Sequence, residues 1–266
     1  IGDLTAVPSS DYPVGIAVAI PLPKHVIKDL QLAPTREYYK LYTTLNDKLN
    51  AIVTAGEKYL TGRGYQAYAQ TTDRITVDSD NRSPLPHKTV ATRAGLGWIG
   101  KNTNLIIPGK GSFFFLGEIV TTLELDYDSP QENRCGNCRR CLDACPTGAL
   151  ESARHLNANK CISYLTIEHK EDIPSELASR LGNRLYGCDT CQEVCPWNRF
   201  AVPTREAAFA PSPAFLSFKK EDLADFTRED YNRIFAKSAV KRAKYEGLIR
   251  TIANKRKIIN NKKDKP

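Results

Sequence analysis

Eight cysteines between positions 135 and 195 constrain this chain more than any other feature, because the chain has no other cysteine. The first four have the spacing C-x2-C-x2-C-x3-C-P, and the last three end in a second C-P pair. A cubane iron–sulfur cluster needs four converging thiolates, and two-residue gaps let one loop supply three of them. The pattern therefore predicts two [4Fe–4S] clusters.

The fourth cysteine of such a run ligates the other cluster in two-cluster ferredoxins, which predicts two interleaved ligand sets. Cluster one takes Cys135, Cys138, Cys141 and Cys195, and cluster two takes Cys145, Cys161, Cys188 and Cys191. Zinc sites favour two separate C-x2-C pairs, and disulfides do not need such tight clustering. Cysteines committed to clusters indicate a reducing compartment, so we expect a cytoplasmic protein.

The part before the cysteines has the pattern of an α/β domain. Val14–Ile20 (VGIAVAI) predicts a buried strand, and Thr35–Leu60 has apolar residues at every third or fourth position, as in an amphipathic helix. Tyr65–Gln70 returns as a strand, and strand, helix and strand in succession indicate an α/β arrangement. No apolar run is long enough to cross a membrane. Because the chain has no methionine, we expect further residues before Ile1.

A glycine-rich loop separates this domain from the cysteines. Gly95, Gly97 and Gly100 form G-x-G-x-x-G without a clear preceding strand, which is a weak nucleotide-binding signature. Glycine allows the close approach of a large flat ligand or of a neighbouring chain segment, and an ordinary glycine turn under a sheet is the plain alternative. Leu105–Ile107 and Ser112–Leu116 are predicted strands on either side of a turn.

The net charge of +8 is concentrated at the C-terminal end. Residues 233–266 have twelve Lys and Arg and two acidic residues, so the rest of the chain is slightly acidic. Lys237, Lys241 and Lys244 recur at helical spacing and predict a helix face that could contact a phosphate backbone. Its packed side is predicted to consist of Val240, Ala243, Gly247 and Leu248. Residues 255–266 alone have the composition of a solvated basic tail.

Several motifs occur in an order that resembles the epoxyqueuosine reductases, which catalyse the last step of tRNA queuosine synthesis. They are AGLGWIGKNT (94–103), SFFFLGEI (112–119), the first cysteine run, CISYLTIE (161–168), GCDTCQEVCPWN (187–198) and SAVKRAKYEGLIR (238–250). The resemblance implies three parts: an α/β (α+β) cobalamin-binding reductase domain, a ferredoxin-like double [4Fe–4S] domain, and a C-terminal helical segment with a basic tail. The boundaries that we expect are 1–130, 131–203 and 204–266.

The resemblance also implies cofactor and partner sites. The implied cobalamin-binding residues are Gly95, Gly97, Trp98, Lys101, Asn102, Thr103, Leu105, Ser163 and Asp189. The implied partners are the anticodon stem-loop of tRNA, met by Lys237, Lys241 and Lys244, and a low-potential electron donor such as a flavodoxin or ferredoxin. We expect a monomer that acts without a membrane.

The position of the catalytic acid remains open between neighbouring residues. The family's aspartate lies in a segment like VDSAPVLER, whereas this chain has VDSDNRSPLPHK at 77–88. Matching V-D-S selects Asp78, but ungapped counting from the glycine loop reaches Asn81, with Asp80 beside it. Asp78 and Asp80 are therefore both candidate proton donors. The plain alternative is a loop whose side chains cap their own backbone.

Two other functions fit parts of the sequence. One is a corrinoid and iron–sulfur reductase that acts on a small molecule, similar to reductive dehalogenases, and the N-terminal half also resembles a related class of double-cluster proteins. The other is a bare electron carrier of the ferredoxin type. A basic helix favours tRNA over a small molecule. The roughly 130 residues before the clusters are more than a carrier needs.

Overall fold

The computed structural model describes residues 1–7, 10–22, 36–75, 77–78, 83–200, 225–235 and 238–263. The chain forms two compact units whose segments alternate along the sequence. Unit 1 comprises Ile1–Leu22, Thr43–Cys138 and Pro196–Val202. Unit 2 comprises Pro23–Tyr42, Arg139–Cys195 and Pro203–Pro266.

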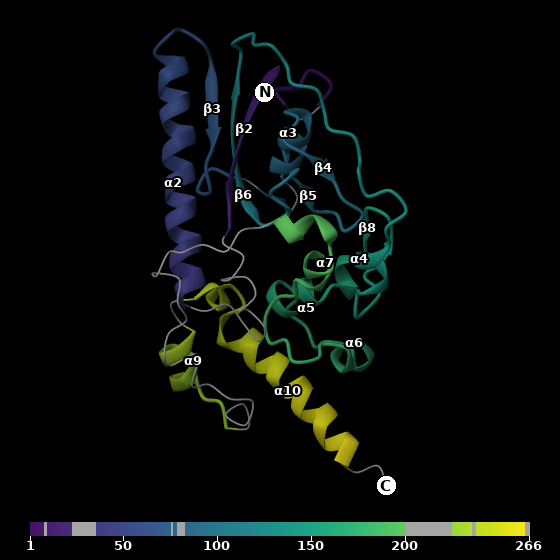
Figure 1. Cartoon of the computed structure of the whole chain (residues 1–266). Coiled ribbons are helices and arrows are strands. Elements are labelled where there is room, and N and C mark those ends of the chain that lie inside the picture. The colour runs from purple at the N-terminus through teal and green to yellow at the C-terminus, as the bar shows by residue number, and fades with distance from the viewer. Residues whose placement is uncertain are drawn as a thin grey trace. The chain divides into compact units, whose positions relative to one another are not determined.

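Unit 1 is built on a four-stranded sheet (Figure 1). Its strands, in spatial order, are β1 (Gly2–Asp3), β2 (Val14–Pro21), β6 (Phe114–Thr121) and β3 (Ala67–Gln70). Every neighbouring pair is antiparallel, so β2 and β3 run parallel to each other on either side of β6. The predicted strand–helix–strand unit is therefore present, but a later strand separates its two strands.

The helix that connects β2 to β3 is α2 (Arg36–Thr61), which confirms the predicted helix to within one residue at each end. Leu49 and Val53 on this helix are buried. A Cβ at Gly117 of β6 would lie 2.7 Å from the Leu49 side chain, and a Cβ at Gly56 would overlap Ile119. Glycine in both elements thus permits a helix-to-strand approach that larger side chains would prevent.

Unit 1 contains further short elements besides this sheet and α2. They are α3 (His87–Arg93), the hairpin of β4 (Trp98–Ile99) and β5 (Leu105–Ile106), and the 3-10 helix η2 (Pro196–Phe200). Val90 of α3 packs against β2, because a Cβ at Gly15 would lie 2.7 Å from its side chain. The expected strand Ser112–Leu116 is wrong in its bounds, since β6 begins at Phe114 and continues to Thr121. Its extension crosses Glu118, a residue that strand patterns avoid.

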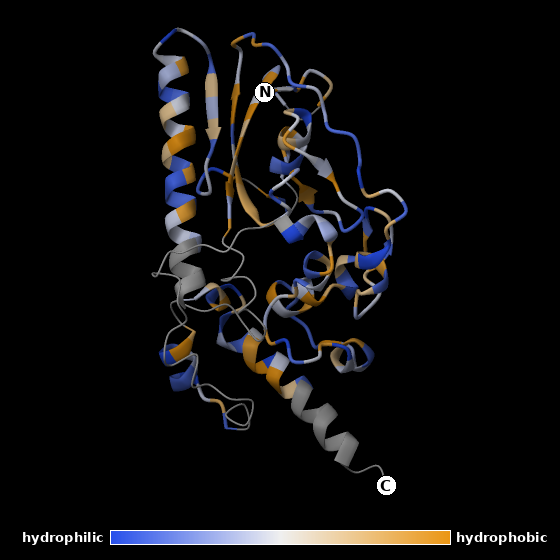
Figure 2. Ribbon diagram, viewed as in Figure 1, coloured by the Kyte–Doolittle hydropathy of each residue, from blue (hydrophilic) through white to orange (hydrophobic). Residues whose placement is uncertain are grey.

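Unit 2 contains short elements and one long helix. They are α4 (Arg140–Asp143), β7 (Leu150–Ser152), β8 (His155–Leu156), η1 (Ala158–Lys160), α5 (Ile162–Ile167), α6 (Ser175–Ser179), α7 (Thr190–Glu193), α9 (Arg228–Ile234), η5 (Ala239–Arg242) and α10 (Lys244–Lys263). Figure 2 shows hydrophobic residues along β2 and β6 of unit 1 and on the first turns of α10. Within the described residues, no helix combines the length and the apolar character needed to cross a membrane.

The predicted basic helix is interrupted. Lys241 lies in η5, whereas Lys244 begins α10 with a φ of 59°, in the left-handed region. Such a residue breaks a helix, so the two lysines do not share one continuous helical face. Lys237 lies outside the described residues. The predicted packed side is confirmed at Val240 and Leu248, which are 0% and 1% exposed.

Candidate active site and cluster-binding segment

The glycine-rich loop of unit 1 is shaped by contacts with its own chain. Gly95 has a φ of 68°, and a Cβ there would lie 2.7 Å from the carbonyl oxygen of Ser129. A Cβ at Gly97 would overlap the backbone of Ile106 in the β4–β5 hairpin. The close approach that these glycines permit is therefore that of neighbouring chain, which was one of the two alternatives.

Two tryptophans meet beside this loop. Trp98 is 2% exposed, and its ring centroid lies 4.9 Å from that of Trp197 in an edge-to-face arrangement. Asn198, the next residue, is held in place within unit 1, because its Oδ1 accepts from the Ser112 backbone N–H at 2.7 Å. Within the part of the chain that the structure describes, the buried Trp98 Nε1 has no hydrogen-bond partner, although a buried indole N–H usually has one. An acceptor atom of a bound ligand would satisfy it.

Lys101, at the end of the same loop, contacts the segment that begins the cysteine run. Its Nζ donates to the carbonyl oxygen of Gly136 at 2.7 Å and to that of Cys138 at 2.9 Å. Asn102 and Leu105 are 3% and 2% exposed, so their side chains are enclosed by protein. Lys101 therefore contacts the cluster-binding segment, whereas the side chains of Asn102 and Leu105 are buried.

The four predicted ligands of cluster two all belong to unit 2. Cys161 is the N-cap of α5, and burial raises the pKa of its thiol, with a further increase from Cys188 and Cys145. Burial, followed by the charges of Cys188, Asp189 and Cys161, raises the pKa of Cys191 to about 12. Thiolates that raise one another's pKa repel one another unless a positive centre compensates them, which fits the donor set of a cluster.

Hydrogen bonds arrange the peptide groups around these thiols. The Ser163 hydroxyl accepts from the Cys188 N–H at 3.0 Å and donates to the Cys188 carbonyl at 3.3 Å. The Asp189 carboxylate accepts from Gln192 at 2.7 Å, and burial raises the pKa of Asp189. Both residues were expected to bind cobalamin, and the contacts found here join them to the cluster-two loop. Among the described residues, no three Cys, His, Asp or Glu side chains are arranged to hold a single metal ion.

The predicted ligands of cluster one are divided between the units. Cys135 and Cys138 belong to unit 1, and Cys141 and Cys195 to unit 2. In the unit 1 part, the Cys138 N–H donates to the Cys135 carbonyl at 3.1 Å, and Asn133 Oδ1 accepts from the Cys135 N–H at 2.9 Å. These bonds form a tight turn between the first two cysteines.

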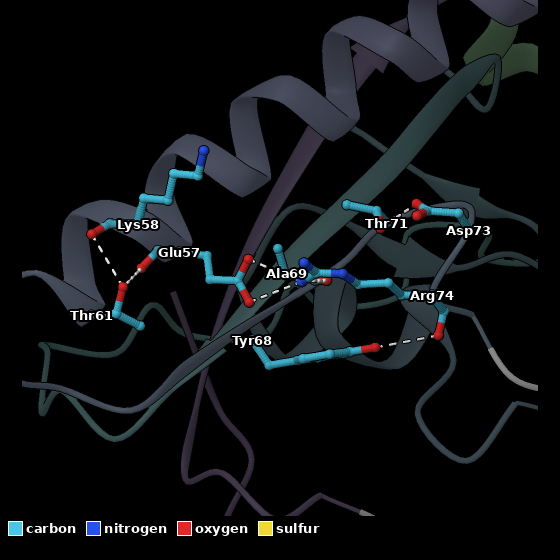
Figure 3. Close-up of polar contacts among 8 residues, drawn as sticks. All are labelled: Glu57, Lys58, Thr61, Tyr68, Ala69, Thr71, Asp73 and Arg74. Atoms are coloured by element: carbon cyan, nitrogen blue, oxygen red, sulfur yellow. Dashed lines mark hydrogen bonds and ion pairs between the residues drawn. The ribbon is translucent and has the colours of Figure 1, made fainter.

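The chain that leads to the candidate acids is fixed at a turn after β3 (Figure 3). Arg74 Nη1 donates to both carboxylate oxygens of Glu57, at 2.9 and 3.0 Å, and the guanidinium lies 5.6 Å from the Tyr68 ring centroid. The hydrogen bond and the charge of Glu57 raise the pKa of Arg74. Asp78 follows four residues later and is exposed, whereas Asp80 lies outside the described residues.

A buried carboxylate lies in the middle of β6. Glu118 is 1% exposed, and its Oε2 lies 2.8 Å from Nδ1 of His87, the first residue of α3. The pair does not meet hydrogen-bond geometry, but a separation of 2.8 Å joins the two groups as an ion pair when the imidazole is protonated. No other hydrogen-bond partner of this carboxylate is found among the described residues.

Comparison with known proteins identifies similar sequences for the cysteine-rich segment and for much of the chain around it. Residues 134–198 match the family model of the 4Fe-4S double cluster binding domain. The epoxyqueuosine reductase of Cellulophaga algicola is 46% identical over 179 residues, which are 67% of this chain and 58% of that relative. The enzyme of a Synechocystis species is 48% identical over 163 residues, which are 60% of this chain and 56% of that relative.

Solved structures extend the match beyond these sequence alignments. A crystal structure of epoxyqueuosine reductase with an epoxyqueuosine-modified tRNA stem loop has a TM-score of 0.69 and 27% identity, covering 95% of this chain and 66% of that one. The Streptococcus thermophilus enzyme has a TM-score of 0.68 and 27% identity, covering 95% and 69%. The chain is therefore similar to the epoxyqueuosine reductases in sequence and in fold. It spans less than two thirds of the length of the two curated relatives.

Relationship to the epoxyqueuosine reductases confirms the resemblance and the fold class expected from sequence. It also confirms that the cysteine window belongs to a domain for two 4Fe-4S clusters. The ligand sets, the cobalamin residues and the lysines remain predictions. Of the nine residues expected to bind cobalamin, seven lie in unit 1, and Ser163 and Asp189 lie in unit 2.

Three site features were missed from sequence. Glu118 lies inside the motif SFFFLGEI and Trp197 inside GCDTCQEVCPWN, but neither motif alone indicates what its polar or aromatic residue contacts. Arg250 was quoted only as the end of a basic motif. Its guanidinium donates to the carbonyl oxygens of Leu165, at 2.9 Å, and of His169, in the segment that ends α5.

Proposed function

We propose that this chain reduces epoxyqueuosine to queuosine in tRNA. The observation that carries the proposal is the similarity to a solved epoxyqueuosine reductase with an epoxyqueuosine-modified tRNA stem loop, over 95% of this chain. The double cluster domain at residues 134–198 adds the electron-transfer part that a reductase needs. The proposal makes the chain an oxidoreductase whose substrate is a modified base.

The proposed cofactors are two [4Fe–4S] clusters and cobalamin. The resemblance to the family is the main support for a cobalamin site. The N–H of buried Trp98, which has no partner among the described residues, also supports a ligand at this loop. The side chains of Asn102 and Leu105 are at most 3% exposed, so we expect a ligand to contact the Trp98 N–H, the backbone of the loop and Thr103. When bound, cobalamin supplies a strongly reducing cobalt centre.

The reaction requires protons as well as electrons. Removal of the epoxide oxygen breaks both of its C–O bonds, restores a carbon–carbon double bond and releases the oxygen as water. Two electrons and two protons are consumed. The clusters, held by the two predicted sets of cysteines, would supply the electrons one at a time from a low-potential donor such as a flavodoxin or ferredoxin. Asp78 and Asp80 remain the candidate groups for donating a proton to the departing oxygen.

The test is a single-turnover assay under anaerobic conditions. Chemically reduced protein with both clusters and cobalamin is mixed with a tRNA anticodon stem-loop that contains epoxyqueuosine, and the product nucleoside is identified by mass spectrometry. We expect the loss of one oxygen atom. If the protein binds cobalamin and both clusters but leaves this substrate unchanged, the small-molecule reductase is the better function.

Two matched variants assign the acid in the same assay. Asp78→Asn is expected to keep cobalamin and RNA binding and to reduce turnover by about 10²-fold or more, as loss of a general acid does. Asp80→Asn is its control, with the same chemical change two residues away. If Asp80→Asn is the inactive variant, the alignment on V-D-S is wrong, and if neither variant is slow, the acid is another residue.

A further inference from the structure

Lys101 lies in a motif that the resemblance connects with cobalamin, yet its contacts in unit 1 are with the cysteine run. Its Nζ donates to the carbonyl oxygens of Gly136 and Cys138, at 2.7 and 2.9 Å. These carbonyls belong to the turn between Cys135 and Cys138. Thirty-five or more residues separate the lysine from its acceptors, so the contact depends on the tertiary structure.

The ammonium determines the direction of two peptide groups in this turn. Gly136 has a φ of 49°, which glycine tolerates and most other residues avoid. With the carbonyls of Gly136 and Cys138 bound to one cation, the turn has fewer alternative conformations. Hydrogen bonds to an ammonium are among the stronger ones in proteins, so the contact can hold the turn in place.

The charge of Lys101 has no carboxylate partner among the described residues. No ion pair joins Lys101 to a carboxylate within the part of the chain that the structure describes, where ten other ion pairs occur. Two carbonyl dipoles disperse a positive charge but do not cancel it. A cluster bound by Cys135 and Cys138 would therefore have an ammonium group that is hydrogen-bonded to the backbone of one of its ligands.

We propose that Lys101 is a positioning residue for cluster one, and that its positive charge raises the reduction potential of that cluster. The inference rests on the proposed ligand set, in which Cys135 and Cys138 bind cluster one. Reduction adds a negative charge to the cluster, and a nearby cation stabilises the reduced form. Residues behind the ligands act on metal centres in this way, by orienting the ligands and by adjusting the local charge.

The experiment compares three variants of the full chain after anaerobic reconstitution. Lys101→Met removes the charge and the donor at similar length, and Lys101→Arg keeps both. Lys88→Met is the matched control, because Lys88 Nζ also donates to a backbone carbonyl in unit 1, that of Thr103 at 3.0 Å. Iron content and an EPR-monitored potentiometric titration are measured for each, and neither requires RNA or cobalamin.

The expected result is specific to one cluster. Lys101→Met should shift the midpoint potential of one cluster to a lower value, or lose that cluster and about half of the iron, while the other cluster is unchanged. Lys101→Arg should restore the iron content and most of the potential, and Lys88→Met should match the wild type in both. In a Cys191→Ala background, which removes a predicted ligand of cluster two, the shift should persist in the remaining cluster.

Two outcomes separate this inference from the function on which it rests. If wild-type protein binds two clusters and Lys101→Met has the same potentials and iron content, the role of Lys101 is wrong and the proposed function is unaffected. The role is equally wrong if the shift affects the cluster that Cys191→Ala removes. If wild-type protein binds no clusters, the ligand assignment fails, and the inference fails with it.

Discussion

Glu118 is the residue whose environment differs most from what its type suggests. A carboxylate that is 1% exposed in the central strand of a sheet is costly unless it is paired, and the only partner found for it in the described residues is His87. His87 begins α3, so the pair joins this helix to β6 across 31 positions of sequence. The pair therefore supports the packing of α3, from which the glycine-rich loop continues.

Replacement of His87 should destabilise unit 1. In His87→Leu the buried carboxylate loses its imidazole partner, and we expect a loss of about 1–3 kcal/mol, since a buried group without its partner costs about that much. The measurement is anaerobic thermal or urea unfolding of the cluster-loaded protein. Glu118→Gln should cost less in the His87→Leu background than in wild type. Additive costs of the two substitutions would contradict a direct interaction.

Helix α5 begins at a predicted ligand of cluster two and is held at its other end by side chains from the C-terminal segment. Cys161 is its N-cap. Two arginines of the C-terminal segment bind the C-terminal end of the helix: Arg250 at backbone carbonyls and Arg242 at the carboxylate of the C-cap Glu168. Arg250 donates to the carbonyl oxygens of Leu165 and His169, and burial lowers the pKa of Arg250. The last carbonyls of a helix have no partner within it, so Arg250 supplies what the short helix lacks. Some of the basic residues near the C-terminus thus have internal structural roles.

Loss of Arg250 should release iron from cluster two. Arg250→Met leaves the carbonyls of Leu165 and His169 without a donor, and we expect α5 to loosen and iron to fall from about eight to about four per chain, the content of one [4Fe–4S] cluster. Iron analysis after reconstitution measures this. Arg242→Met is the control, because the Arg242 side chain is 61% exposed and its bond to Glu168 is a surface ion pair of small value. Full iron retention in Arg250→Met would contradict the role of the arginine.

Over the whole molecule, the bounds of a helix or strand could be predicted where its apolar residues keep one period, helical or alternating, from end to end. Helix α2 and strand β2 were found to within about one residue of their ends. Strand β6 was placed too early, because Glu118 ends the apolar pattern while its pairing with His87 is a tertiary contact. The predicted C-terminal helix continues through Lys244, because the spacing of lysines does not reveal that Lys244 has a left-handed backbone conformation. Cysteine spacing predicted the double cluster domain, whereas the acceptors of Lys101 and Arg250 depend on tertiary contacts that sequence does not show.

The proposed function also requires the basic C-terminal region to bind tRNA. Lys241 and Lys244 are exposed on two different elements, so we expect them to contact different phosphates and not to act as one row. Lys241→Glu with Lys244→Glu should weaken binding of the stem-loop regardless of its sequence. Each lost contact should also reduce the slope of log affinity against log salt by about one.

The control for this experiment has the same change in net charge elsewhere. Lys48→Glu with Lys58→Glu reverses two exposed lysines on α2 of unit 1. Fluorescence anisotropy at several salt concentrations measures affinity and slope for both double variants. If both pairs weaken binding equally, the effect is due to overall charge. If the pair at 241 and 244 changes neither affinity nor slope, these lysines do not contact the RNA, and the charge of this end is used internally, as it is at Arg250.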